Sequence, residues 1–208
     1  VAAVRGLTID QLAVIDSAKI IGLQSRQLGA LSSAQIRALS PEQFDALSTS
    51  QLAALTSVAL ASLETEDIAT LTSTELSALS TRALSGLSSA NFAVLTSSQL
   101  SGLTTAQIAS LSTTVIAGLT SGQIDGLSAL QVSGLTSRQI PVLTTDVIAS
   151  FDTDQIAALK SSAVAALSSG QVAALSTQQV EVLTTGQLAA LTSAGIKGLG
   201  SDDIDVLS

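Results

Sequence analysis

The sequence contains no cysteine, histidine, methionine, tryptophan or tyrosine. Without cysteine the chain can form neither a disulfide nor a zinc–thiolate site. Without histidine it lacks the commonest general base and metal ligand. An enzyme made from these residues would have to rely on Ser, Thr, Asp, Glu, Lys and Arg. The composition therefore disfavours catalysis before any motif is considered.

The remaining reactive side chains form no recognisable site. Lys160, Ser161 and Ser162 are the only close Ser–Lys grouping, and they occupy ordinary surface positions of the repeat described below. The aspartates lack the spaced Asp/Asn set, the glycine and the closing glutamate of a calcium loop. We expect no catalytic, cofactor-binding or metal-binding residues, and no enzymatic activity. The aspartates considered are Asp152 and Asp154, and Asp202, Asp203 and Asp205.

Charge is also scarce. Charged residues make up 12% of the chain, the net charge is −8, and none lies between Arg82 and Asp125. An acidic chain is poorly suited to nucleic acid, which needs a basic stripe. Polar residues interrupt every apolar run, so the sequence predicts no transmembrane helix. A low-charge surface rich in Ser and Thr is typical of a protein that packs side by side, lies on a surface or carries glycans on its hydroxyls.

The sequence consists of one motif with a period of eight, Leu-[Ser/Thr]-[Ser/Thr]-x-Gln-[Ile/Leu]-x-[Ala/Gly], numbered here as positions 1 to 8 of an octad. Position 1 is apolar in all 26 octads from Leu7 to Leu207, and position 6 is apolar at every eighth residue from Val4 to Ile204. Position 2 is Ser or Thr at 20 of 26 sites, and position 5 is Gln at 14 of 26. Such self-similarity indicates a repeat architecture.

The period of eight restricts the backbone. In one continuous helix, eight residues overshoot two turns by about 80°, so an apolar stripe would spiral around the helix and no straight partner could cover it. In strands, positions 1 and 6 differ in parity and would face opposite sides. A β-solenoid with two octads per coil remains the alternative, although Leu and Ala dominate where β-branched and aromatic residues would be expected.

One short helix per octad explains the pattern better. With position 2 as N-cap, Gln falls at N3 and completes a capping box, while positions 1 and 6 form a hydrophobic staple. Pro41 then lies at N1, where proline is favoured because its missing N–H would be unpaired. The sequence therefore predicts an all-α solenoid, or superhelix, of very short N-capped helices. Phe44, Phe92 and Phe151 are predicted to lie in its apolar core.

Three details of this solenoid are harder to predict. Pro141 falls at N5, so its octad is expected to have a helix of barely one turn or a distortion. Glycine at position 8 suits a left-handed helix end, but valine at the same position in other octads resists positive φ, so the turn geometry stays open. Departures from Gln at position 5 that lie 32 residues apart suggest a superhelical turn of four octads. The full set of departures, of which only several are spaced by 32 residues, is Ala3, Lys19, Ala59, Ala83, Val115, Val147, Ala163 and Gly195.

No linker or second domain interrupts the repeat, so residues 1–208 are expected to be a single continuous array. One octad buries too little apolar surface to fold alone, and stability must come from stacking on neighbours. Val1 and Ser208 are both in phase, without a polar capping repeat. We expect the array to be part of a longer one, or its ends to meet other copies.

The octads LTTAQIASL, LSSAQIRAL and LSSGQVAAL resemble arrays of the type L-T-T-A-Q-[IV]-A-A-L in very large bacterial surface and secreted proteins, including adhesin-like proteins. The resemblance implies an extracellular or cell-surface location and a structural or adhesive role. We expect a scaffold that forms or extends a bacterial fibre, sheath or adhesin stalk by end-to-end and lateral self-association. The alternative is a binding module whose Ser/Thr array recognises a periodic surface such as ice, polysaccharide or mineral.

Overall fold

The computed structural model describes residues 6–207, so Ala3, Val4 and Ser208 lie outside the described residues. Within that range the chain forms 24 α-helices of four to six residues and one 3₁₀ helix, and residues 6–207 contain no strand. One helix or helical turn corresponds to each octad. The prediction of an all-α solenoid of short helices is confirmed, and the β-solenoid alternative is wrong.

Most of the α-helices begin as the capping box predicts. In the octad at Leu31, the Gln35 N–H donates to Ser32 Oγ at 3.3 Å, and the Ser32 N–H donates to Gln35 Oε1 at 2.9 Å. Pro41 occupies the first helical position after the N-cap Ser40. These reciprocal bonds satisfy two of the donors that a helix N-terminus leaves unpaired. Local sequence therefore determines where each helix starts.

Each helix ends without a left-handed residue. The N–H of the position 1 leucine donates to the position 6 carbonyl, as in Leu39 N–H to Ile36 O at 3.2 Å. The leucine and the following N-cap are both extended, for example Leu111 at φ −64° and ψ 142° and Ser112 at φ −68° and ψ 153°. No residue of 6–207 has a positive φ. The left-handed role considered for the position 8 glycines is therefore wrong, since two extended residues already redirect the chain.

The chain divides into two compact units, Val1–Leu95 and Thr96–Ser208. The octad register continues through both in the sequence, and the single-domain array stays a prediction. Unit 1 contains α2 (Ile9–Ala13), α3 (Ser17–Ile20), α4 (Ser25–Leu28), α5 (Ser33–Arg37), α6 (Pro41–Asp45), α7 (Thr49–Leu52), α8 (Ser57–Leu60), α9 (Thr65–Thr70), α10 (Ser73–Ala78), α11 (Thr81–Leu84) and α12 (Ser89–Ala93).

Unit 2 continues with the same element type. It contains α13 (Ser97–Leu100), α14 (Thr105–Ser110), α15 (Thr113–Ile116), α16 (Ser121–Ile124), α17 (Ala129–Val132), the 3₁₀ helix η1 (Ile140–Val142), α18 (Thr145–Ala149), α19 (Thr153–Ala158), α20 (Ser161–Val164), α21 (Ser169–Ala173), α22 (Thr177–Glu181), α23 (Thr185–Ala190), α24 (Ser193–Ile196) and α25 (Ser201–Asp205). The 3₁₀ helix contains Pro141. Its presence confirms the distortion predicted there, because proline cannot donate the hydrogen bond of an α-helix interior.

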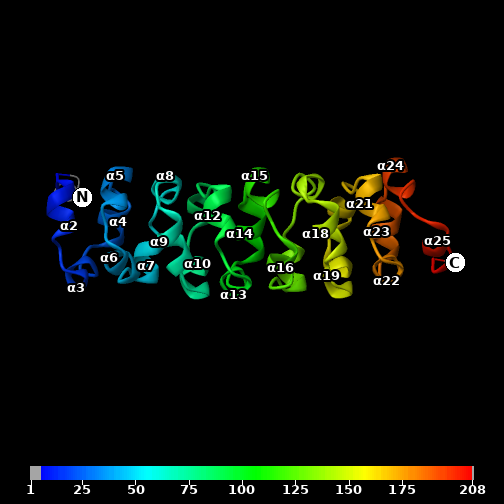
Figure 1. Cartoon of the computed structure of the whole chain (residues 1–208), viewed down its shortest axis with the longest axis horizontal. Helices are drawn as coiled ribbons and strands as arrows, with labels where there is room; N and C mark the ends of the chain where they lie inside the picture. Colours follow the sequence, from blue (N-terminus) through cyan, green and yellow to red (C-terminus); the bar gives the residue numbers. More distant parts are fainter. Residues whose placement is uncertain (1–5, 208) are drawn as a thin grey trace. The chain divides into compact units, whose positions relative to one another are not determined.

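In both units each helix packs against the third helix along the chain. In unit 1, α2 packs on α5, α5 on α8 and α8 on α11, and Figure 1 shows α5 and α8 following one another along one side. In unit 2, α13 packs on α16 and α20 on α23. Three octads therefore make one superhelical turn, which we call a coil. The four-octad turn suggested by the 32-residue spacing is wrong.

The core of each unit consists of the side chains at positions 1 and 6. In unit 1, Leu52 and Leu55 are buried, and in unit 2 Val172 and Leu167 are buried in the same way. The three phenylalanines, Phe44, Phe92 and Phe151, lie in this core as predicted. Exceptions occur near the limits of the sequence, where the position 6 residues Ile196 and Ile204 are about half exposed.

Candidate functional site: the glutamine ladder between coils

The position 5 glutamine does more than cap its own helix. In unit 1, Gln51 is 2% exposed, and its Oε1 accepts the Ser48 N–H at 2.9 Å. Its Nε2 donates to the carbonyls of Ile20 and Leu23, both at 2.9 Å. These two residues lie 31 and 28 positions earlier, in the preceding coil. One side chain thus joins the start of its own helix to the end of another.

Unit 2 repeats the arrangement. Gln171 Oε1 accepts the Ser168 N–H at 3.0 Å, while Nε2 donates to Ile140 O and Leu143 O, each at 2.8 Å. We call this set of side chains, each donating from position 5 to a carbonyl of the preceding coil, the glutamine ladder. Its members within the two units are Gln35, Gln43, Gln51, Asn91, Gln131, Gln139, Gln155, Gln171, Gln179 and Gln187.

The ladder solves a problem specific to very short helices. A helix leaves its first N–H groups and its last C=O groups unpaired, and in helices of four to six residues these make up most of the backbone. The glutamine amide accepts from one end and donates to the other, so a single buried group satisfies both. Among residues 6–207 no buried side-chain nitrogen or oxygen lacks a hydrogen-bond partner.

Sequence reasoning placed these glutamines only in capping boxes and missed the contact between coils. A capping box accepts Glu as readily as Gln, because only the acceptor oxygen is used. Position 5 nevertheless holds Gln 14 times and Glu only at Glu75. That preference for an amide over an isosteric carboxylate is the signal that a donor N–H is also required.

The position 8 glycines mark the closest approach of coils. A Cβ placed on Gly86 would lie 2.0 Å from Ser57 O, and one placed on Gly198 would lie 2.2 Å from Ser169 O. Glycine is required there because a neighbouring backbone occupies the space of a side chain. Gly118 differs, since a Cβ there would meet nothing closer than Val115 O at 3.5 Å. The requirement thus varies from octad to octad.

Comparison with known protein families agrees with this repeat geometry. The ALTTAQ repeat matches three segments, residues 20–57, 60–97 and 148–185, which together cover more than half of the sequence. The chain belongs to the ALTTAQ repeat family. A comparison with curated proteins finds no match. Membership agrees with the repeat array that the structure shows.

Several octads of this ALTTAQ repeat chain lack an amide at position 5. In unit 1, Asp67 and Glu75 place carboxylates there. Burial raises the pKa of the Asp67 carboxyl, the Glu64 N–H that it accepts at 3.3 Å opposes that shift, and the charges of Glu64, Glu66 and Asp45 add to it. The ladder is therefore interrupted in unit 1 by this acidic pair together with Ala59 and Ala83 on either side of it.

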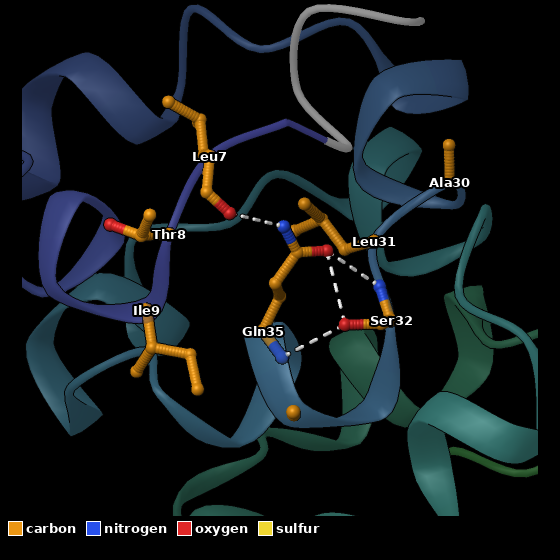
Figure 2. A pocket seen from close by; sticks show the side chains of 8 residues that line it. Leu7, Thr8, Ile9, Ala30, Leu31, Ser32 and Gln35 are labelled. Carbon is orange, nitrogen blue, oxygen red and sulfur yellow. Dashed lines mark hydrogen bonds between the residues drawn. The ribbon is translucent and has the colours of Figure 1, made fainter.

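One pocket of about 650 Å³ lies in unit 1, between the turn at Leu7–Ile9 and the segment 30–35. Figure 2 shows that Gln35 forms its polar wall, with Nε2 donating to Leu7 O at 2.8 Å and Oε1 accepting from Ser32. The polar atoms of this wall are thus already paired within the ladder. The pocket is a groove between two coils of the ALTTAQ repeat.

The side chains considered as sites in the sequence have structural positions. Lys160 occupies an N-cap and makes no side-chain capping bond, and the neighbouring Ser161 and Ser162 are exposed. Asp152 is an N-cap whose Oδ1 accepts the Gln155 N–H at 2.7 Å. Asp203 lies at N3 and accepts the Gly200 N–H at 2.9 Å. No group of three or more metal-ligating side chains occurs among residues 6–207.

The surface of the ALTTAQ repeat chain carries scattered charges and many hydroxyls. At the N-caps the hydroxyls are occupied, as in Ser176 Oγ, which accepts the Gln179 N–H at 3.3 Å. A hydrogen bond from Ser40 lowers the pKa of the exposed Glu42 carboxyl. No helix in the described part of the chain is long and apolar enough to cross a membrane.

Proposed function

We propose that this chain is a structural scaffold that forms or extends an extracellular bacterial fibre, sheath or adhesin stalk. The observation that carries the proposal is the repetition of one contact. In both units, coils present carbonyls at their helix ends and receive amides from the next coil, through the same atoms and at the same sequence separation. Such an interface has no built-in limit to the number of coils.

Stacking of this kind also suits association between copies. A head-to-tail contact uses different surfaces on the two partners and propagates as a filament unless it closes into a ring. The extracellular location rests on the resemblance to bacterial surface and secreted arrays.

The rival function is recognition of a periodic surface, such as ice, polysaccharide or mineral, by the hydroxyl array. The N-cap hydroxyls argue against a dedicated binding array, because capping alone requires them. Thr184 Oγ, for example, accepts the Gln187 N–H at 3.3 Å and donates to Gln187 Oε1 at 3.0 Å. A hydroxyl that is already bonded in this way has little capacity left for a ligand.

The test is a concentration series of the purified chain, followed by light scattering and negative-stain electron microscopy without added ligand. We expect the mass to rise with concentration and filaments of a single width to appear. A closed oligomer of fixed size would contradict propagation. Retention of a chain of constant mass on polysaccharide beads would favour the rival function.

A matched pair of variants tests lateral packing. Ala109 lies in the stretch without charge, Ala157 lies outside it, and both are exposed at position 7 of their octads. We expect Ala109→Glu to reduce the bundling of filaments, because it introduces a charge that must be desolvated on close packing. Ala157→Glu should leave bundling unchanged. Equal bundling in both variants would rule out this stretch as the lateral contact.

A further inference from the structure

Between the ladder members Gln51 and Asn91, four successive octads of unit 1 lack an amide at position 5. Two of them have alanine there, and the other two have the acidic pair Asp67 and Glu75. A ladder glutamine donates to the carbonyl of the residue 28 positions earlier. For Asp67 and Glu75, the carbonyls at that separation belong to Leu39 and Leu47. Both leucines are buried, and no hydrogen bond from another described residue reaches either carbonyl. A donor on Asp67 or Glu75 would complete the pattern.

The chain itself shows that side chains of these lengths can reach. Asn91 has the same length as Asp67, and its Nδ2 donates to Leu63 O at 3.1 Å. Gln51 has the same length as Glu75, and it donates to Leu23 O at 2.9 Å. A protonated carboxyl has the shape of the corresponding amide and carries one O–H donor. Geometry therefore permits the missing bonds whenever the carboxyl is neutral.

We propose that Asp67 and Glu75 are protonation-dependent members of the glutamine ladder. When neutral, each donates its O–H to the carbonyl of Leu39 or Leu47 and ties two coils of unit 1 together. When ionised, each carboxylate has no O–H to donate, so its oxygen and the backbone carbonyl oxygen are both acceptors and the bond between the coils is lost. Acidification thus strengthens stacking in this part of the scaffold.

The charges around Asp67 favour the neutral form. Helix α9, which bears Asp67, begins after Glu64 and carries Glu66, and the adjacent helix α6 carries Glu42 and Asp45. The other helix packed on α9, α12, has no charged residue. No cation on these three helices compensates for the carboxylates.

Glu75 has a simpler environment. It is the only charged residue of α10, and the helix α7, which packs on α10, has none. Its Oε2 accepts the Thr72 N–H at 2.8 Å and the Thr72 hydroxyl at 2.8 Å. One carboxyl oxygen thus has the capping role, as Oε1 does in the glutamines. The second oxygen corresponds to the amide nitrogen that donates between coils.

The sign of the pH dependence follows from the raised pKa of Asp67. A carboxyl whose pKa is higher in the folded chain contributes stability that is fully present below its unfolded pKa and is lost as the pH rises through its folded pKa. The exposed Glu42 has a lowered pKa and acts in the opposite direction. Measurements in a Glu42→Gln background remove that opposing contribution.

The experiment is hydrogen exchange of the full chain, read by mass spectrometry at pH 7 and about pH 4, with rates expressed as protection factors. We expect the protection of segments 39–47 and 63–79 to be two- to tenfold higher at the acidic pH, the factor typical of one net hydrogen bond. In the double variant Asp67→Asn, Glu75→Gln, protection should be high at both pH values. A double variant that keeps the pH dependence of the parent would overturn the proposal.

A matched control separates hydrogen bonding from charge repulsion. Asp45→Asn removes a neighbouring carboxylate and leaves position 5 unchanged, so the acid-dependent protection should persist. If Asp45→Asn abolished it as completely as the double variant does, repulsion alone would explain the effect and the proposal would be wrong. Asp154→Asn, an exposed site in unit 2, should leave unit 1 unaffected.

Discussion

Replacing a ladder glutamine by alanine should cost far more than a capping residue normally does. Gln171 is 3% exposed and makes three bonds through its side-chain amide, one to Ser168 N–H and two to the carbonyls of Ile140 and Leu143. At about 0.5–1.5 kcal/mol net for each, Gln171→Ala should lower the free energy of unfolding by roughly 1.5–4.5 kcal/mol. The capping role alone predicts a loss of less than about 1 kcal/mol.

Two variants of the same octad separate these contributions. Ser168→Ala removes the hydroxyl that accepts the Gln171 N–H at 3.2 Å, and it should cost about 1 kcal/mol. Gln171→Glu keeps the acceptor for the Ser168 N–H and removes both donors. It should therefore be strongly destabilising at neutral pH and less so in acid, where the carboxyl becomes neutral.

The assay is denaturant unfolding followed by far-UV circular dichroism, since the chain has neither tryptophan nor tyrosine for fluorescence. Repeat arrays can unfold in parts, so hydrogen exchange of segment 140–175 should accompany it. If Gln171→Ala proved no more costly than Ser168→Ala, the contact between coils would contribute nothing, and the ladder would be a capping device alone.

Further predictions concern the core, the coil spacing and pH. Leu111→Asp should cost several kcal/mol in thermal melts, because it buries an unpaired charge; a tolerated substitution would show that position 1 is not core. Gly86→Ala should destabilise by about 1–3 kcal/mol through its clash with Ser57 O, whereas Gly118→Ala should be neutral or stabilise by up to about 1 kcal/mol. Denaturation midpoints that rank these two variants in the opposite order would contradict the assigned coil contacts. The Asp67 contribution to stability should decline as the pH rises through its raised pKa, which a titration of the unfolding free energy checks against Asp67→Asn.

Local sequence alone determined where the helices lie. The N-cap, the N3 glutamine and the staple residues are all within six positions of one another, so one octad contains everything needed to start its own helix. Ser40, Pro41 and Gln43 illustrate this, because each has the capping position that sequence reasoning gave it. The apolar identity of positions 1 and 6 likewise predicted the core. Burial of such side chains depends on their chemistry more than on the details of packing.

Tertiary structure decided the rest. Three octads rather than four complete a turn because the backbone angles of the two extended residues set the direction of each successive helix, and no sequence pattern encodes those angles. The sequence suggests that glycine at position 8 serves a left-handed backbone conformation. In the structure Gly86 is needed for a different reason, because Ser57 of another coil occupies the space that a side chain would fill. The second role of glutamine was hidden for the same reason. The Gln171 amide donates to carbonyls 28 and 31 residues away. Every residue has a backbone carbonyl, so the sequence does not mark which of them the folded chain brings next to this amide.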